Sequence, residues 1–351
     1  MQFTILTPGP SVHTIEIWRH INSDGDFEKM WRHLEKSFGV KPSERRLELV
    51  LAGLEVDLVR GKGGGTLYLK INPLKLIDAT VDAAQIIPPD EKEFRKAMKE
   101  LRKRLKLLKL PDDLSEYIAV RVDLCVNIRA DKNSAVREWL RLQRKRLSPT
   151  CCKQKPFHDK RLSKKENRAC GRDYYRLQTP HGTLVVYDKC KQADRCGVLG
   201  FDRMPKKILR IEWQLTDSAM RDVKARYQLD EVDLVLALML DSGSLFKNNL
   251  DGLYYGGQYR KEKDVVKIIE ASNYQNKVKE RMLAFVKWAK KDGEGKAADK
   301  YMKEYGDKAF RRIRRRFEEL NIQPVPLRKN FREDSLEPLE SSLLRLLEDE
   351  G

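Results

Sequence analysis

The sequence predicts an α+β fold: a mixed or antiparallel sheet with flanking helices, followed by a helical C-terminal region. Apolar and polar residues alternate along 118–128 and 207–215, as expected of strands with one face on a core. Strand signals follow one another between residues 174 and 215, which argues against a doubly wound parallel sheet. After Ser218 the apolar residues recur at helical spacing instead.

The elements before residue 150 are predicted from apolar spacing and from residues that start or stop helices. Gly39 is expected to end the first helix, Asp90 to cap the second and Ser134 to cap the third. The glycine cluster at 61–65 lacks the Gly-Lys-Ser/Thr ending of a phosphate loop and stands between two strands, so it predicts a hairpin turn. The expected elements are strands at 12–18, 54–59, 66–71 and 118–128, and helices at 27–38, 91–108 and 135–147.

The second half of the chain begins with a polar, basic segment at 149–172, for which a mobile loop is expected. A division near residues 216–228 is expected to separate an α+β domain, 1–220, from a helical region, 221–351. The expected elements are strands at 174–178, 183–191 and 208–215, and helices at 234–240, 278–289, 310–320 and, in an acidic tail, 334–350.

Composition limits the class of protein. Charged residues make up 35% of the chain and apolar residues 40%, so the chain is polar but can bury a core. No apolar run approaches the length of a membrane span, and the first residues do not resemble a secretory signal, so we expect a cytoplasmic protein without a membrane partner. The six cysteines are scattered and are interpreted as free thiols. A zinc site is the less favoured alternative, because the paired short spacing of a zinc module is missing.

The chain is strongly basic, with a formal net charge of +18 from 71 Lys and Arg against 53 Asp and Glu. Basic residues cluster at 102–104, 144–146 and 311–316. An excess of this size favours a polyanionic partner, and nucleic acid is favoured over an acidic membrane surface because the basic helices have core-facing apolar stripes of their own. A soluble protein with an ordinary charged surface remains the alternative.

Three expected strands carry side chains that suit phosphodiester chemistry. Asp123 and Glu212 each stand two residues after an arginine and point away from the apolar face of their strand. Tyr187 and Lys189 share one face of the strand between them. If the three strands lie in one sheet, these four side chains converge, and the set suits metal-assisted attack on a phosphodiester. The alternative is an ordinary half-exposed sheet with charges on its outer face.

Five short stretches of the chain form an ordered set of motifs: 67–76, 120–124, 186–192, 209–215 and 317–326. The first four resemble, in the same order, motifs of the rolling-circle replication initiators of small plasmids and their phage relatives of the gene II/X type, and the fifth is a further match to the phage type. The resemblance covers about residues 66 to 330 and leaves out the first 60 residues and the acidic tail.

The resemblance implies a site-specific, metal-dependent DNA endonuclease and strand transferase that starts rolling-circle replication. Tyr187 matches the nucleophile of the family, which forms a covalent 5′-phosphotyrosine, and Tyr174 and Tyr175 are rival nucleophiles. Asp123 and Glu212 match the metal-binding or acid–base carboxylates, so Mg²⁺ or Mn²⁺ is the expected cofactor.

Other residues are assigned by the same resemblance. Lys189 matches a basic position two residues beyond the tyrosine. The five histidines include no His-hydrophobe-His pair, so a carboxylate-ligated metal is required in place of the histidine site of the other large nicking class. The expected DNA-binding residues follow instead from the clustering of charge and from the positions of arginines before the two carboxylates: they are Arg121, Arg210, Arg311, Arg312, Arg314, Arg315 and Arg316.

The implied partner is origin DNA, single-stranded or folded into a hairpin at the nick site. A host helicase, a DNA polymerase and a second copy of the chain are further expected partners, and the helical region 221–351 is expected to bind DNA or mediate oligomerisation. A conjugative relaxase shares every motif and remains an alternative, as does a nucleic-acid-binding protein without catalytic activity.

Overall fold

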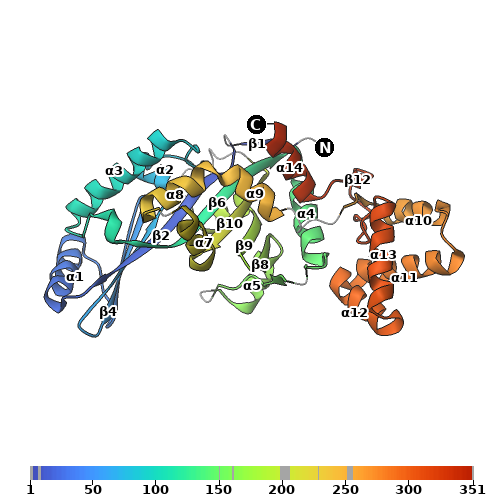
Figure 1. Ribbon diagram of the computed structural model, residues 1–351, viewed down its shortest axis with the longest axis horizontal. Helices are drawn as coiled ribbons and strands as arrows, with labels where there is room; N and C mark the ends of the chain where they lie inside the picture. The colour runs from blue at the N-terminus through green and yellow to red at the C-terminus, as the bar shows by residue number, and fades with distance from the viewer. Residues whose placement is uncertain are drawn as a thin grey trace.

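A ten-stranded antiparallel sheet organises the structure (Figure 1). The structure is a computed structural model, and it describes residues 3–6, 9–149, 151–159, 162–197, 206–227, 229–250 and 256–349. The strands of the sheet are β1 (Phe3–Ile5), β2 (Ser11–Ile21), β3 (Arg46–Leu51), β4 (Leu54–Gly61), β5 (Gly64–Ile71), β6 (Ile118–Ala130), β7 (Lys153–Gln154), β8 (Tyr174–Thr179), β9 (Gly182–Asp188) and β10 (Ile208–Thr216). The order is β3-β4-β5-β2-β6-β10-β9-β8-β7, with β1 also paired to β6. Every pairing is antiparallel, which confirms the expected sheet type.

The described ranges contain fourteen α-helices in two groups (Figure 1). The helices around the sheet are α1 (Asp24–Phe38), α2 (Pro73–Ile77), α3 (Glu91–Leu107), α4 (Asn133–Lys145), α5 (Lys164–Gly171), α6 (Lys189–Arg195), α7 (Asp217–Tyr227), α8 (Glu231–Leu240), α9 (Ser242–Leu250) and α14 (Leu339–Asp349). The helices at the far end are α10 (Glu262–Ala271), α11 (Asn276–Asp292), α12 (Glu294–Tyr305) and α13 (Asp307–Glu319).

The period-two alternation of the strands gives the sheet one apolar face. On β10, Leu209, Ile211 and Trp213 are buried on that face, as the sequence predicts. Contacts join α7 to β6 and β10, α8 to β2 and β6, and α9 to β2, so these helices cover the centre of the sheet (Figure 1). The remaining alternate residues of β6, β9 and β10 form the opposite face, which carries the polar side chains.

The β4–β5 hairpin packs against α1 through a glycine. A Cβ atom on Gly65 would lie 2.2 Å from the Phe27 ring, so only glycine lets the helix approach the strand this closely. The helix begins after Ser23, whose side chain caps it, and ends at Gly39, which has a left-handed φ of 63°. The hairpin and the Gly39 stop are therefore confirmed.

The predicted start of the third helix is wrong. Lys132 is the N-cap of α4 and makes no side-chain cap hydrogen bond, and Ser134 lies inside the first turn. The helix ends at Lys145, before the predicted end at residue 147, because Arg146 is already extended.

Two predictions for the centre of the chain, at 149–172 and 183–191, also need correction. The segment at 149–172 is not one loop, because it contains β7 and α5. A capping box between Ser163 and Glu166 starts α5. The predicted strand at 183–191 ends at Asp188, whose carboxylate accepts a 3.1 Å hydrogen bond from the Lys191 amide and so starts α6.

The helices α10 to α13 have an aromatic core of their own. The Phe285 ring lies 5.8 Å from Tyr301, 6.0 Å from Phe310 and 5.8 Å from Phe317, measured between ring centres. This helical group contacts the end of α4, where the Leu147 amide donates to Glu294 Oε2 at 3.0 Å. Among the described residues, no helix is long and apolar enough to cross a membrane.

The chain returns from the helical group to the sheet. Strands β11 (Tyr259–Arg260) and β12 (Ser335–Leu336) pair where the chain enters and leaves this group. Helix α14 then contacts α9 and β1, close to the N-terminus (Figure 1). Because α8, α9 and α14 all pack around the sheet, the helices beyond residue 220 do not form one group, and the division of the chain at that residue stays a prediction.

Candidate active site on the polar face of the sheet

Three neighbouring strands bring the predicted site residues to one face of the sheet. In the antiparallel register, Arg210 on β10 is opposite Asn127 on β6 and Tyr187 on β9. Glu212 stands two residues further along β10 and shares this face, as does Asp123 on β6, which is opposite Gln214. Asp123 and Glu212 are thus diagonal neighbours across one strand pair, about 7–8 Å apart at the backbone.

Tyr187 and Glu212 form a buried pair. The tyrosine hydroxyl donates a 2.6 Å hydrogen bond to Glu212 Oε1, and the two residues are 9% and 6% exposed. Burial, together with the Glu212 charge, raises the pKa of the Tyr187 phenol well above its ordinary value. The phenol is therefore neutral at rest, with a proton acceptor already in place.

Asp123 is held by an arginine from its own strand. Arg121 donates from Nε to Oδ1 at 2.7 Å and from Nη2 to Oδ2 at 2.6 Å, and its Nη1 donates to Glu16 at 3.0 Å. Burial raises the pKa of Asp123 to about 7; Arg121 opposes this shift, and the Glu212 charge adds to it. Arg121 therefore orients the carboxylate, and only part of its side chain, 31%, faces solvent for a DNA contact.

The two carboxylates share one face of the sheet, and both oxygens of Asp123 already accept hydrogen bonds from Arg121. Two hard oxygen donors on neighbouring strands can bind Mg²⁺ or Mn²⁺ when waters or substrate phosphate complete the coordination. Glu212 Oε2 lies 3.5 Å from the Gln214 amide, so it is less firmly engaged than Oε1. Within the described parts of the chain, no group of three or more His, Cys, Asp or Glu is arranged to hold a metal ion.

Lys189 lies beside the tyrosine but not on its strand. It is the first residue of α6, where its Nζ donates to Gln192 Oε1 at 2.9 Å and lies 5.9 Å from the centre of the Tyr187 ring. Burial, with the positive charge of Arg210, lowers the pKa of Lys189 to about 7. The side chain is thus close to half-protonated at neutral pH, which suits a proton donor or acceptor.

Replacing Lys189 with methionine is expected to remove part of the pH dependence of stability. An unfolded lysine holds its proton up to a pKa of 10.5, whereas folded Lys189 releases it at about 7, so the unfolded state binds more protons between these values. The free energy of unfolding of the wild type should therefore rise with pH across this window, by up to roughly 1.4 kcal/mol per pH unit. Urea unfolding from about pH 6.5 to about 9.5 measures the slope, and identical slopes for both proteins would contradict the burial of a titrating amine.

The structure contradicts the prediction that Arg210 binds DNA. Its side chain is fully buried and donates from Nε to Asn127 at 2.8 Å and from Nη2 to the carbonyl of Ala83 at 2.9 Å. A loop that follows α2 supplies this carbonyl and covers the polar face here. Sequence alternation does not reveal such a cover, because the loop is more than a hundred residues away. Arg210 instead adds a fixed positive charge opposite Tyr187.

His13 belongs to this site and was missed by the sequence reasoning. The register of β2 against β6 shifts between Val12 and Thr14, so a β-bulge interrupts the alternation at His13. Burial and the charges of Arg210 and Lys189 lower the pKa of the imidazole well below its ordinary value. A neutral imidazole therefore lies near the lysine, and no period-two pattern would have placed it there.

The two rival tyrosines lie on different faces. Tyr174 is opposite Tyr187 in the β8–β9 register, and the two rings stack with their centres 6.4 Å apart. Tyr175 faces the apolar side, is 5% exposed and lies near Arg146. Only Tyr174 therefore remains near Glu212 as a rival nucleophile.

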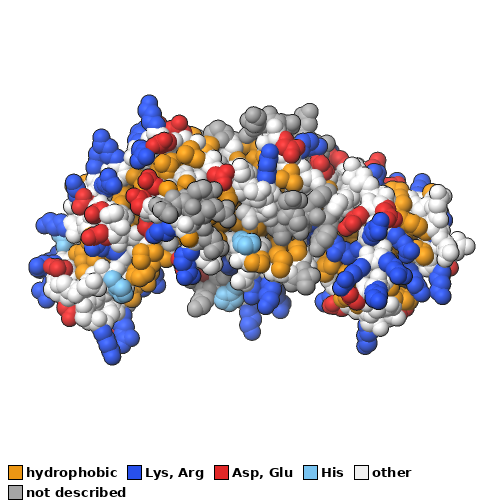
Figure 2. All heavy atoms as spheres, in the orientation of Figure 1, with side chains coloured by type: hydrophobic (Ala, Val, Ile, Leu, Met, Phe, Trp, Pro, Cys, Tyr) orange, Lys and Arg blue, Asp and Glu red, His pale blue; other side chains and the backbone are white. Residues whose placement is uncertain are grey.

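The predicted arginines of α13 lie in the helical group at the far end, where Lys and Arg side chains gather on the visible face (Figures 1 and 2). Arg311, Arg312 and Arg315 are exposed on this helix. Arg311 pairs with Asp307 at 2.7 Å and Arg315 with Glu319 at 3.1 Å. Such exposed pairs contribute little, so these side chains stay accessible to a partner.

The other two α13 arginines are half-buried. Arg314 lies over the Phe310 ring, 6.0 Å from its centre, and Arg316 lies over Tyr274 at 5.4 Å. These contacts make Arg314 and Arg316 part of the packing of α13 as well as of its charge.

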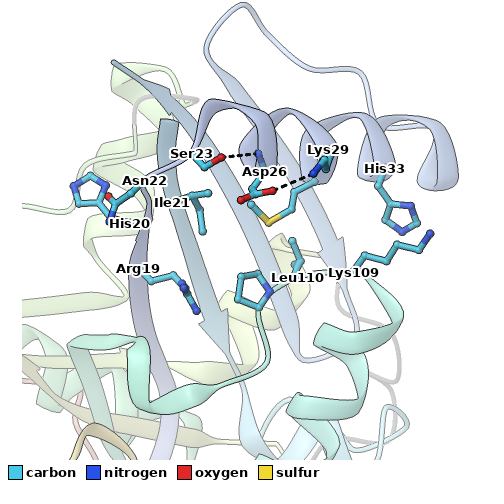
Figure 3. Close-up of a pocket in the computed structure, with 12 residues that line it drawn as sticks. Arg19, His20, Ile21, Asn22, Ser23, Asp26, Lys29, His33, Lys109 and Leu110 are labelled. Carbon is cyan, nitrogen blue, oxygen red and sulfur yellow. Dashed lines mark hydrogen bonds and ion pairs between the residues drawn. The ribbon is translucent and has the colours of Figure 1, made fainter. Parts of the chain in front are cut away.

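A cavity of about 720 Å³ lies outside the candidate site, between β2, α1 and the end of α3 (Figure 3). Arg19, His20, His33 and Lys109 are among its lining residues. Figure 3 shows Asp26 among the lining residues, with its carboxylate directed at Lys29. None of the predicted site residues lines this cavity.

No protein-family model matches the chain, and no curated protein matches it. The resemblance of its short motifs to rolling-circle initiators therefore stays a prediction, and the interpretation of the site depends on its own residues and geometry.

Proposed function

We propose that this protein is a site-specific, metal-dependent DNA nicking endonuclease and strand transferase that initiates rolling-circle replication. The proposal depends above all on the 2.6 Å hydrogen bond from the Tyr187 hydroxyl to Glu212. This contact joins a nucleophile to a proton acceptor on a sheet face that also holds Asp123. The net charge of +18 favours a DNA substrate.

In this proposal, Tyr187 Oη attacks a phosphodiester while Glu212 accepts the phenolic proton. A bond forms between Oη and phosphorus, and the bond from phosphorus to the 3′ oxygen breaks. The products are a 5′-phosphotyrosine and a 3′ oxygen, which takes a proton from Lys189. One phosphate ester replaces another, so the step can run backward and rejoin the strand.

The remaining site residues position these groups. Arg121 fixes the orientation of Asp123 through its two hydrogen bonds, and Arg210 supplies a buried positive charge opposite the tyrosine. A Mg²⁺ or Mn²⁺ ion bound to Asp123 and Glu212 would stabilise negative charge on the phosphate. Before substrate binds, the buried phenol keeps its proton and is therefore a poor nucleophile. It becomes reactive when a substrate phosphate lies near it and Glu212 takes up the proton.

A nucleic-acid-binding protein without catalytic activity is the second candidate. The 9% exposure of Tyr187 favours it, because a tyrosine with a packing role has the same burial. The two candidates differ in a simple assay: an enzyme converts supercoiled plasmid carrying the cognate origin to open circles with Mn²⁺, whereas a binding protein only retards it in a gel. A conjugative relaxase would nick a transfer origin instead.

Duplex binding is proposed for the exposed arginines of α13. Replacing both Arg312 and Arg315 with alanine is expected to weaken binding to duplex origin DNA. It should also flatten the log–log salt dependence by about 1 to 2, because each phosphate contact contributes about 0.9. Fluorescence anisotropy at several salt concentrations measures both quantities. Cleavage of a short single-stranded substrate at saturation should not change, because α13 lies in the helical group, away from β9, the strand that carries Tyr187 (Figure 1).

The matched comparison is Arg95→Ala with Arg102→Ala on the exposed side of α3. This pair should leave duplex affinity and salt slope unchanged. If instead the α3 variant loses affinity while the α13 variant binds like the parent, α13 is a packing element and the duplex surface lies on α3.

A further inference from the structure

Helix α5 presents an unpaired basic stripe beside the candidate site. Lys164, Arg168 and Arg172 recur every four residues, Lys165 lies next to them, and together they line a shallow groove of about 550 Å³. All four side chains are exposed, and among the described residues none of them makes an ion pair. Figure 2 shows Lys and Arg side chains at the lower centre, where Figure 1 places α5.

The surroundings do not neutralise this stripe. The segment 151–178 contains nine basic and three acidic residues. Of the acids, Glu166 is engaged in the capping box, and Asp173 pairs with Lys191 and Arg195. Arg176 on β8 is exposed and lies on the same strand face as Tyr174. A polyanion is therefore the partner that this surface fits.

A row of aromatic rings connects the stripe to the proposed nucleophile. Phe157 packs against α5, because a Cβ atom added to Gly171 would lie 3.7 Å from the Cβ atom of Phe157. The Phe157 ring contacts Tyr174 edge-on at 5.1 Å between centres, and Tyr174 stacks on Tyr187 at 6.4 Å. Phe157 and Tyr174 are both half-buried, so each keeps some surface that solvent can reach.

One side chain on α5 binds the backbone at Asp159, two residues after Phe157. Asn167 on α5 accepts a 2.7 Å hydrogen bond from the Asp159 amide and donates to the carbonyls of Asp159 at 3.0 Å and Leu162 at 2.9 Å. The aromatic ring and the basic stripe are therefore held in one arrangement, which lowers the entropy lost on binding.

We propose that Phe157, Tyr174 and the α5 stripe bind the single-stranded segment next to the scissile phosphate, with a base stacked on Phe157 and phosphates along α5. Aromatic rings beside unpaired cations are the combination that binds single strands without sequence preference. A duplex cannot stack its paired bases on Phe157, so this surface selects the single-stranded form. The inference rests on the proposed function, because it places the segment relative to Tyr187.

The test uses the full chain and a fluorescent thymidine oligonucleotide of about 12 nucleotides, which is within the usual single-strand site size. Lys164→Ala with Arg168→Ala should weaken binding and flatten the log–log salt dependence by about 1.4, because each single-strand phosphate contributes about 0.7. The matched control is Arg32→Ala with Lys36→Ala, which removes the same residue types at the same spacing from exposed positions on α1. The control should bind like the parent.

Phe157→Leu separates stacking from charge. Leucine keeps an apolar side chain against Gly171 but removes the ring, so oligonucleotide binding should weaken by about 5- to 150-fold. Phe157→Trp should retain binding, and neither change should alter duplex affinity. Near-parent binding by both the α5 variant and Phe157→Leu would overturn the inference, as would an equal loss of duplex and single-strand binding.

The outcome is separable from that of the proposed function. If the parent nicks its origin and the α5 variant keeps the parent's affinity for the oligonucleotide, only the inference fails. If the parent binds the oligonucleotide through α5 and Phe157 but never nicks origin DNA, the single-strand surface stands and the nicking activity fails.

Discussion

Tyr187→Phe is expected to abolish nicking and the covalent protein–DNA adduct while leaving DNA binding intact. Phenylalanine keeps the ring that stacks on Tyr174 but removes the hydroxyl that donates to Glu212. No other group in the proposed mechanism can form the phosphoester, so the rate should fall by on the order of 10⁴-fold or more. Losing this buried hydrogen bond should also lower the free energy of unfolding by about 1–3 kcal/mol.

The measurement is conversion of supercoiled origin plasmid to open circles, with mass spectrometry of the adduct peptide. Tyr174→Phe is the matched control, because Tyr174 lies on the same face but, among the described residues, makes no hydrogen bond to a carboxylate. It should keep the activity of the parent. An adduct mapped to Tyr174, or one formed by Tyr187→Phe, would show that the nucleophile has been misassigned.

Asp123→Asn and Glu212→Gln should each lose metal-dependent cleavage, by roughly 10²- to 10⁴-fold. Both changes preserve size, so the packing of the polar face is retained while one negative charge is removed. Glu212→Gln can still accept the tyrosine hydrogen bond at Oε1, but it no longer takes up the proton. Asp123→Asn leaves Arg121 with one fewer charged partner and replaces a charged carboxylate ligand with a neutral amide.

Glu16→Gln is the control for the loss of one negative charge beside Arg121. Glu16 is the other carboxylate that Arg121 contacts, and it is half-buried. It should nick at close to the parental rate. Titration with Mn²⁺ and with EDTA completes the experiment, since chelation should stop the parent. Full activity in excess EDTA, or undiminished nicking by either carboxylate variant, would refute a shared metal site.

The strands of the candidate site were predictable because their side chains obey a strict period of two. Alternation along β6 and β10 places Asp123 and Glu212 on the face opposite Leu209, Ile211 and Trp213, and the structure has them there. Alternation says nothing about what lies beyond that face. Arg210 was expected to reach solvent, but distant carbonyls bind it, because a loop from another part of the chain packs over this end of the sheet.

Where the local pattern breaks, sequence reasoning fails for identifiable reasons. The β-bulge at His13 moves one side chain out of the alternation, so its place in the site was not visible. Helix α5 has a polar, basic surface and buries little beyond Cys170, so it offers no apolar stripe to recognise. Its one readable signal was the Ser163–Glu166 capping box, and the interpretation of 149–172 as a loop passed over it.

The return of the chain through α14 determines how the molecule can be dissected. The Arg146 guanidinium contacts Glu340 at 2.6 Å, and the Trp139 indole donates to the Glu337 carbonyl at 3.0 Å. Helix α14 and the residues just before it are therefore packed against α4. Ending the chain after α9 would remove Glu340 from a buried ion pair, a loss of about 3–5 kcal/mol. The helical group is therefore an insertion between α9 and α14, and a minimal form of the sheet region would be obtained by excising it and joining these two helices.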